Sequence, residues 1–422
     1  MKTLIQRLAL LALMQAALGP VLLGCDAKSG TPVASLPERA PIEVFSWGGL
    51  QDSLVAEHER RYPQDSIIHA NAQLSDTARR VLRKRLMEGD PPDSFQANAG
   101  ADLMQWVLVN AIDARESRLR PLDDLPGMAE WKATWPDALR NAISHNGQVY
   151  AVPANVHRLN TVFFNPTVLR EVGALPPERV EDLFVLGDAL ARRGIPLLAV
   201  GSKDPWTLSV IIIESLLIAQ HGAEFYESYF GGRLEADDPR LQQTLATALR
   251  LLRYANADRE NLHWEEAARM VFDGRAAMTV MGDWARTLFE GPDLDARYRE
   301  AAFPGTEAVF VFACNTFPLP LGAKNEAGAR RLLESIESLD GQAAIGRSKT
   351  SIPARLDVQV EDALQAKKQA LWRSGRLVLA QSGLVPMTFS SDLNEALAAM
   401  DREQRVSPVV HTLRARYMLL GR

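Results

Sequence analysis

The chain has 422 residues, of which 47% are hydrophobic and 23% charged, and its formal net charge is −5 at neutral pH. This composition is ordinary for a soluble globular protein. A nucleic-acid-binding protein would need a basic patch, so the acidic balance argues against that class. The length exceeds the ~250–300 residues at which one hydrophobic core usually stops growing, so we expect two lobes or domains.

The N-terminus has the layout of a secretory signal peptide over residues 1–24. Lys2 and Arg7 precede an apolar run from Leu8 to Leu23, and a small residue stands before the expected cut. The sequence Leu-Leu-Gly-Cys that ends at Cys25 resembles the lipobox of bacterial lipoproteins, in which the cysteine becomes the lipidated N-terminus. A transmembrane helix is the alternative, but Gln, Gly and Pro interrupt the run, and it is shorter than the ~20 residues of a membrane span.

Residues 25–40 are rich in Ser, Pro and small polar residues, so we expect a flexible tether between the lipid and the folded body. Asp26, directly after the cysteine, resembles the signal that retains lipoproteins in the inner membrane of some Gram-negative bacteria. These features imply a protein on the periplasmic side of the cell envelope, anchored by its N-terminal lipid. Cys314 then has no partner, and we expect no disulfide.

From residue 41 onward, strand and helix candidates alternate. A first strand is expected at 42–45. Residues 178–193 carry apolar side chains at helical spacing, and Gly194 ends that helix. Further helices are expected at 239–254, 264–273 and 327–339, and buried strands at 196–200 and 276–281. The alternation predicts an α/β fold with mainly parallel strand pairing.

Signatures of enzymes and metal sites are missing from the sequence. It has no His-Glu-x-x-His helix, no phosphate loop and no Gly-x-Ser-x-Gly elbow. The seven histidines are scattered without the spacing of metal ligands. Adjacent carboxylates such as Asp123-Asp124 are typical of solvated turns and helix caps. We therefore expect no catalytic residue, no metal and no cofactor.

Three tryptophans stand in polar, loop-like settings. Trp47 precedes two glycines, Trp206 follows Lys-Asp-Pro, and Trp284 follows Met-Gly-Asp. An aromatic ring beside carboxylates and amides is well suited to stack on a sugar ring while the polar groups bind its hydroxyls. Packing in a hydrophobic core is the alternative for each tryptophan taken alone. The recurrence of the pattern favours a carbohydrate site.

Several blocks of sequence together resemble the extracellular solute-binding proteins of carbohydrate ABC importers, in particular their glucose/mannose-binding branch. The most extensive is YAVPANVHRLN at 150–160. Others occur in the same order along the chain, at 88–96, 194–199, 264–268, 273–278, 281–284, 303–306, 319–324 and 351–355.

The resemblance implies the type II-like periplasmic-binding-protein fold, with two α/β lobes joined by hinge crossovers around an interlobe cleft. It assigns 41–151 plus 308–353 to lobe 1 and 152–307 plus 354–422 to lobe 2.

The resemblance also implies a set of ligand-binding residues: Trp47, Gln96, Asn98, Trp206, Asp283, Trp284, Asn315, Lys349 and Ser382. Asn155 and His157 lie in the block next to the hinge, as hinge or cleft support. For His157, a buried hydrogen-bonding role and contact with the sugar both remain open.

Several ligand-side positions depart from the family pattern. Only one tryptophan stands at the first loop, Asn98 replaces a residue that is often cationic, and Asn315 replaces an aspartate. Glucose therefore does not follow as the ligand. Because an amide lacks the charge that strengthens a carboxylate hydrogen bond, the site is expected to bind neutral sugars more weakly or to suit an anionic or derivatised ligand.

The expected function is capture of a mono- or small oligosaccharide by hinge closure and its delivery to a membrane permease and ATPase complex, with the receptor acting as a monomer. A first alternative is a receptor of the same fold with altered or lost sugar affinity that signals to a sensor protein. A second is a tethered glycoside hydrolase. That enzyme needs two facing carboxylates, and Asp283 has no convincing partner.

Overall fold

The computed structural model describes residues 39–47, 52–71, 75–108, 117–289 and 294–420, with the side chains of 75–78 and Lys349 left aside. The signal peptide, Cys25 and nearly all of the tether lie outside the described residues. Residues 38–422 form one compact unit by their internal contacts.

A parallel sheet of order β2-β1-β3 opens the folded body. Its strands are β1 (Ile42–Ser46), β2 (Ile67–Asn71) and β3 (Ser94–Phe95), and Ile42 pairs with Ile67. The connecting helices are α1 (Asp52–Arg61) and α2 (Ser75–Glu88). The first strand and the parallel pairing around it are as the alternation of strand and helix predicts.

A second sheet, of order β10-β8-β9, departs from the predicted parallel pairing. Its strands β8 (Thr161–Phe164), β9 (Met278–Met281) and β10 (Arg299–Ala302) pair antiparallel on both sides of β8. The expected strand at 196–200 forms only isolated parallel bridges, from Leu198 to Ala255 and Met278. Strand direction follows from the connections, and local hydrophobicity does not report it.

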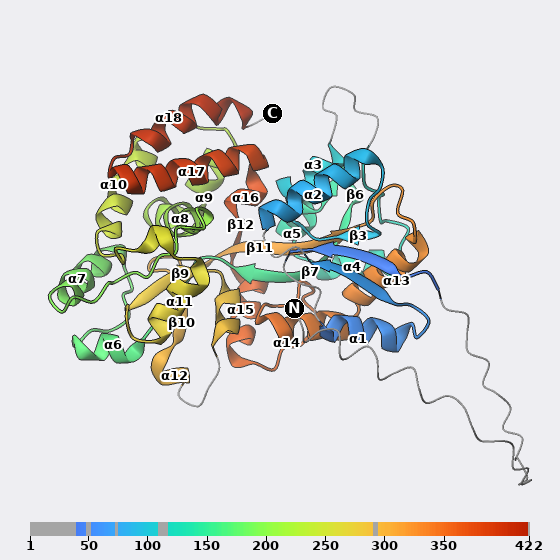
Figure 1. Ribbon diagram of the computed structural model, residues 1–422, viewed down its shortest axis with the longest axis horizontal. Coiled ribbons are helices and arrows are strands. Elements are labelled where there is room, and N and C mark those ends of the chain that lie inside the picture. Colours follow the sequence, from blue (N-terminus) through green and yellow to red (C-terminus); the bar gives the residue numbers. More distant parts are fainter. Residues whose placement is uncertain (1–38, 48–51, 72–74, 109–116, 290–293, 421–422) are drawn as a thin grey trace, which may run out of the picture. The chain divides into compact units, whose positions relative to one another are not determined.

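Two long strands join the rest of the fold. Strand β11 (Val309–Pro318) pairs antiparallel with β7 (Ala151–Arg158) and β4 (Ala97–Asn98), and parallel with β12 (Arg376–Leu379). Figure 1 shows β7 and β11 side by side across the middle of the molecule. Every residue of β7 is buried, as expected of a strand packed on both faces.

The buried apolar residues form two main clusters. Core A holds β1, β3, β7 and α13, and core B holds α7, α8, η1, α9, α10 and α17. Strand β11 belongs to both cores, because Phe310 and Phe312 pack in core A while Val311 packs in core B. These two cores are what the length of the chain predicts.

The segment 354–422, assigned to lobe 2 from the resemblance, divides between the cores. Trp372 of α15 (Ala363–Ser374) is fully buried in core A, where its ring lies 5.1 Å from that of Phe312. From Val378 to Leu420 the buried side chains pack in core B.

The predicted helices are confirmed within a few residues. They are α7 (Val180–Ala191), α10 (Pro239–Leu252), α11 (Trp264–Phe272) and α13 (Glu326–Glu337). Core B also contains α8 (Trp206–Ile211), the π-helical turn η1 (Ile212–Leu216), α9 (Leu217–Phe230) and α17 (Met387–Glu403). The run 206–230 is long and apolar enough to cross a membrane, but 72% of its most apolar window is buried, as in a core helix.

The remaining elements are short. They are α3 (Ala101–Val107), α4 (Met128–Thr134), α5 (Asp137–Ala142), β5 (Ser144–His145), β6 (Gln148–Val149), α6 (Pro166–Glu171), η2 (Arg259–Asn261), η3 (Asp283–Leu288), α12 (Leu294–Arg297), α14 (Leu339–Lys349), α16 (Gln381–Leu384), α18 (Ser407–Arg416) and η4 (Tyr417–Leu419).

Candidate functional site

A row of hydrogen-bonded polar side chains crosses the joining strands. Gln96, between β3 and β4, donates its Nε2 hydrogen to Asn315 Oδ1 of β11 (2.9 Å), and Asn315 Nδ2 donates to Asn155 Oδ1 of β7 (3.2 Å). Asn155 Nδ2 lies 2.8 Å from His157 Nε2, and His157 Nδ1 lies 2.6 Å from Asp283 Oδ1 of η3. Because an amide nitrogen only donates, His157 accepts at Nε2 and donates at Nδ1. The row therefore has one direction and ends on a carboxylate.

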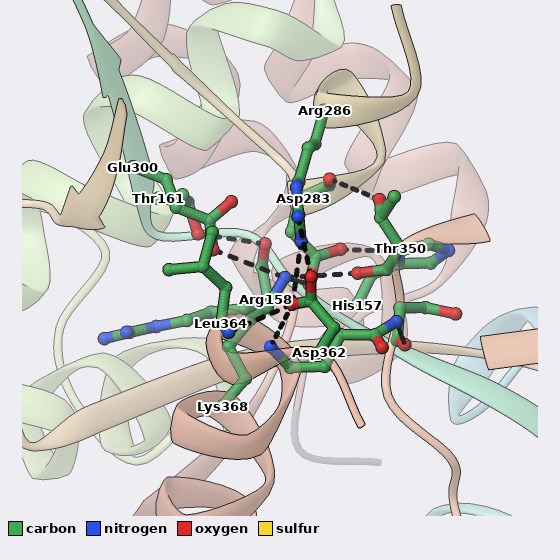
Figure 2. A network of polar contacts seen from close by, with 12 residues as sticks. His157, Arg158, Thr161, Asp283, Arg286, Glu300, Thr350, Asp362, Leu364 and Lys368 are labelled. Carbon is green, nitrogen blue, oxygen red and sulfur yellow. Dashed lines mark hydrogen bonds and ion pairs between the residues drawn. The ribbon is translucent and has the colours of Figure 1, made fainter. Parts of the chain in front are cut away.

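Asp283 is fully buried, and both of its carboxylate oxygens are engaged by protein groups. The second oxygen, Oδ2, lies 2.9 Å from Lys368 Nζ of α15, and Lys368 is also 3.5 Å from Glu300 of β10 (Figure 2). Burial alone would raise the pKa of Asp283, but the Lys368 charge and the His157 hydrogen bond outweigh it, so this pKa lies below its usual value. Asp283, predicted to bind ligand, thus faces the protein and holds His157 in one tautomer.

The same network joins α15 to η3. Thr350 Oγ1 donates to the Asp283 carbonyl (3.1 Å), and Lys368 Nζ donates to the Thr350 carbonyl (3.2 Å). Arg286 makes a bidentate pair with Asp362, at 3.0 and 2.8 Å, and Asp362 in turn caps the N-terminus of α15 (Figure 2). These contacts connect an element of core A with the loop that carries Trp284.

Three half-buried tryptophans lie against one another beside this row. The Trp284 ring contacts His157 edge-on at 5.2 Å, and its centroid is 6.1 Å from that of Trp206 and 6.5 Å from that of Trp264. Gly282 makes this placement possible, since a Cβ there would lie 2.0 Å from the Trp284 ring. The group places aromatic surface next to hydrogen-bonding side chains, the combination that suits a sugar ring.

Trp264 belongs to this group, but the sequence analysis did not select it. Its backbone N–H donates to Asp204 Oδ2 (3.0 Å), and His263 Nδ1 lies 3.2 Å from both Asp204 oxygens. The signal was present, because Trp264 starts a helix and follows a histidine. It was read as part of an amphipathic helix, and the sequence alone does not bring 204 and 264 together.

Trp47 lies apart from the other tryptophans. It packs against core A, and the guanidinium of Arg79 lies over its ring at 4.5 Å. Arg79 Nη2 is 3.5 Å from Asp102, whose Oδ2 also accepts the backbone N–H of Asn98 (3.0 Å). Asn98 pairs with Asn315 across β4 and β11, which links Trp47 to the polar row. Within the described residues, no ring contact joins Trp47 to Trp206 or Trp284.

Two predicted site residues are not linked to the row by a described contact. Ser382 is half-buried in α16, a helix that packs closely on α3, since a Cβ on Gly100 would lie 2.2 Å from the Gly383 carbonyl oxygen. Lys349 ends α14, and its side chain lies outside the described residues. The structure thus connects Gln96, Asn98, Asn155, His157, Trp206, Asp283, Trp284 and Asn315.

Comparisons with known sequences agree on one family. The family described as bacterial extracellular solute-binding protein matches residues 69–371. An uncharacterised ABC transporter extracellular-binding protein of Pyrococcus horikoshii is 29% identical over 404 residues, covering 91% of this chain and 89% of the relative. A probable sugar-binding periplasmic protein of Rhizobium meliloti is 29% identical over 291 residues, covering 67% of each.

Solved structures show the same fold at low sequence identity. A bacterial solute receptor described as preferring β-D-galactopyranose superposes with a TM-score of 0.75 at 16% identity, over 90% of this chain and 99% of that one. A raffinose complex of the solute-binding protein RafE gives a TM-score of 0.71 at 14% identity, over 91% and 100%. The α/β periplasmic-binding-protein fold is therefore confirmed. The chain belongs to the bacterial extracellular solute-binding proteins, a non-enzymatic family.

Proposed function

We propose that this protein is the substrate-binding component of a sugar ABC importer. It captures a mono- or small oligosaccharide between two lobes and delivers it to a membrane permease and its ATPase. The observation that carries the proposal is the group formed by Trp206, Trp264 and Trp284 beside the row from Gln96 to Asp283, because such a group offers both stacking surface and directional hydrogen bonds. The relatives named as sugar-binding support the same ligand class.

We infer that the lobes follow the two hydrophobic cores. Lobe 1 is built from 41–151 plus 308–353, joined by α15, and lobe 2 from 152–307 plus 376–422. Strands β7 and β11 cross between the cores and form the hinge. Ligand contacts to both sides would drive closure, since a ligand shifts a conformational equilibrium only by its differential affinity for the two states.

The residues divide into contacts and supports. Trp206, Trp264 and Trp284 provide stacking surface. Gln96, Asn98, Asn315, Lys349 and Ser382 provide hydrogen bonds to the ligand. Asn155, His157 and Asp283 are buried and hold the contact residues in place.

We also propose that the protein is a lipoprotein. Cleavage after residue 24 would leave Cys25 as the lipidated N-terminus, and Asp26 would retain the protein at the periplasmic face of the inner membrane. In cells, Cys25→Ser is expected to move the protein from the membrane fraction to the soluble fraction and to abolish labelling by a fatty-acid probe. Unchanged labelling of the variant would contradict lipidation at this residue.

The test of sugar binding is titration of the purified protein with mono- and disaccharides, neutral and charged, followed by calorimetry and thermal shift. We expect at least one sugar to raise the melting temperature, because a ligand that binds only the folded state stabilises it. Trp284→Ala is expected to reduce the shift, while Trp284→Phe, which keeps an aromatic face, retains most of it. A protein that binds none of the sugars would refute the proposal.

A further inference from the structure

We propose that the sugar captured by this site carries a negative charge, in the first place a carboxylate. This inference rests on the proposed function, because it assigns a class of ligand to the same site. Three observations lead to it: the carboxylates of the site are already engaged by the protein, the joining strands offer amide donors, and a guanidinium lies over the ring of Trp47.

The carboxylates of the site are the first observation. Asp283 is bound on both oxygens by His157 and Lys368. Asp204 accepts the Trp264 N–H at 3.0 Å and lies 3.2 Å from a ring nitrogen of the neighbouring histidine.

Asp102 is engaged in the same way. It accepts the backbone N–H of Asn98 at 3.0 Å and the side-chain amide of Gln105 at 3.1 Å, and it lies 3.5 Å from Arg79. The hydroxyls of a neutral sugar are strongest as donors to a charged acceptor. Among the described residues, the three carboxylates that contact the predicted site have their oxygens committed to protein donors instead.

The joining strands supply donors in their place. Asn315 is half-buried, and its Oδ1 already accepts from Gln96. One N–H of its Nδ2 is used by Asn155, so the second N–H remains as a donor among the described residues. A donor at this position suits a ligand oxygen that accepts, such as a carboxylate, better than a hydroxyl that must donate.

Arg79 adds a positive charge on the same side. Its guanidinium occupies the face of Trp47 on which a sugar ring would otherwise stack, at 4.5 Å from the ring centroid. The Arg79 side chain is only 22% exposed, so it is partly removed from the water that would screen it. A planar guanidinium matches a carboxylate with two parallel hydrogen bonds. Through Asp102 and Asn98, Arg79 is connected to the strand pair that carries Asn315.

The experiment is calorimetric titration of the purified protein at low salt with matched pairs: D-galacturonate against D-galactose, and D-glucuronate against D-glucose. We expect each acid to bind at least tenfold more tightly than its neutral partner, and the advantage to shrink as sodium chloride is added. Glucose 6-phosphate and a sulfated hexosamine serve as further probes. Preference for one of these over the uronates would support a negative charge and assign it to phosphate or sulfate.

Variants separate a charge effect from a structural one. Arg79→Met is expected to remove most of the preference for the acid while leaving the weaker affinity for the neutral sugar within about twofold, because it deletes the charge and keeps an apolar contact with Trp47. Arg79→Lys keeps the charge and should retain part of the preference. The matched control is Arg250→Met, which removes a guanidinium lying 3.8 Å from the Phe184 ring in another part of the fold and should leave the preference unchanged.

The outcomes distinguish this inference from the proposed function. A neutral sugar that binds as tightly as its acid, or more tightly, would overturn the charged ligand and leave sugar capture standing. An unchanged preference in a folded Arg79→Met would overturn the assignment to Arg79. Failure of every carbohydrate, charged and neutral, to bind would overturn both.

Discussion

Lys368 offers the sharpest test of how the hinge region is held together. It extends from α15 to two acidic side chains on other elements, Asp283 at 2.9 Å and Glu300 at 3.5 Å. The Lys368 side chain is 6% exposed and that of Asp283 is fully buried. Lys368→Met keeps the length and apolar stem of the side chain but removes the only cation in direct contact with this pair in the part of the chain that the structure describes.

The expected cost follows from the burial of Asp283. Removing one member of a buried ion pair costs about 3–5 kcal/mol, because the other charge is left buried without compensation. Asp283 keeps its hydrogen bond from His157, so we expect a loss near the lower limit, about 3 kcal/mol. The double variant Lys368→Met with Asp283→Asn should recover more than half of this loss, since neither charge then remains.

The dependence on pH gives an independent reading. In the wild type the pKa of Asp283 is lowered, so its contribution to stability is present above the unfolded-state pKa of about 3.9 and is lost as pH falls through the folded-state value. Without Lys368, burial dominates and raises the pKa of Asp283, so stability is lost as pH rises instead. The free-energy gap between the variant and the wild type should therefore narrow between about pH 7 and pH 5.

Urea unfolding at both pH values measures these quantities. The control is Lys367→Met, the neighbouring exposed lysine of the same helix, which should change stability by less than about 0.5 kcal/mol. A Lys368→Met variant that loses less than about 1 kcal/mol, the range of an exposed ion pair, would refute the description of this pair as buried and coupled.

Three further predictions concern the tryptophan group and core B. Trp264→Ala should weaken sugar binding about fivefold, because one aromatic contact contributes ~1 kcal/mol, and calorimetry with the best sugar measures it. Gly282→Ala should weaken binding as well, since its Cβ would lie 2.0 Å from the Trp284 ring; unchanged affinity and tryptophan fluorescence would contradict this geometry. Burial raises the pKa of Glu214 in η1 to about 7, so wild-type stability should fall as pH rises from about 4.5 to 7, and Glu214→Gln should flatten that slope in urea unfolding.

Local pattern was sufficient for most helices. The stripe at 239–254 predicts α10, in which Leu241 and Leu245 are fully or almost fully buried, because a 3.6-residue period places them on one face whatever they pack against. The pairing of β8 with β9 and β10 was not predictable in this way. An antiparallel and a parallel buried strand have similar compositions, and their direction depends on where distant segments return.

The site was predictable in part. The tryptophan pattern indicates Trp206 and Trp284, and the structure brings them into contact. It also places Asp283 beneath the aromatic group instead of on its surface, because His157 and Lys368, distant in sequence, converge on its carboxylate. Lys368 was missed because nothing in the sequence of α15 distinguishes it from the exposed Lys367 next to it.

The direction of the polar row explains why its one buried charge lies at its end. Amides and a neutral imidazole can pass hydrogen bonds along β11 and β7 without desolvating a charge, and each donor fixes the orientation of the next acceptor. A carboxylate within the row would need a cation beside it among the joining strands. With Asp283 at the end, the cation comes from α15, which packs in core A, while Asp283 lies on the loop of Trp284. Lys368 therefore tethers the aromatic group to the opposite core, and movement of one core against the other would have to carry or break this pair.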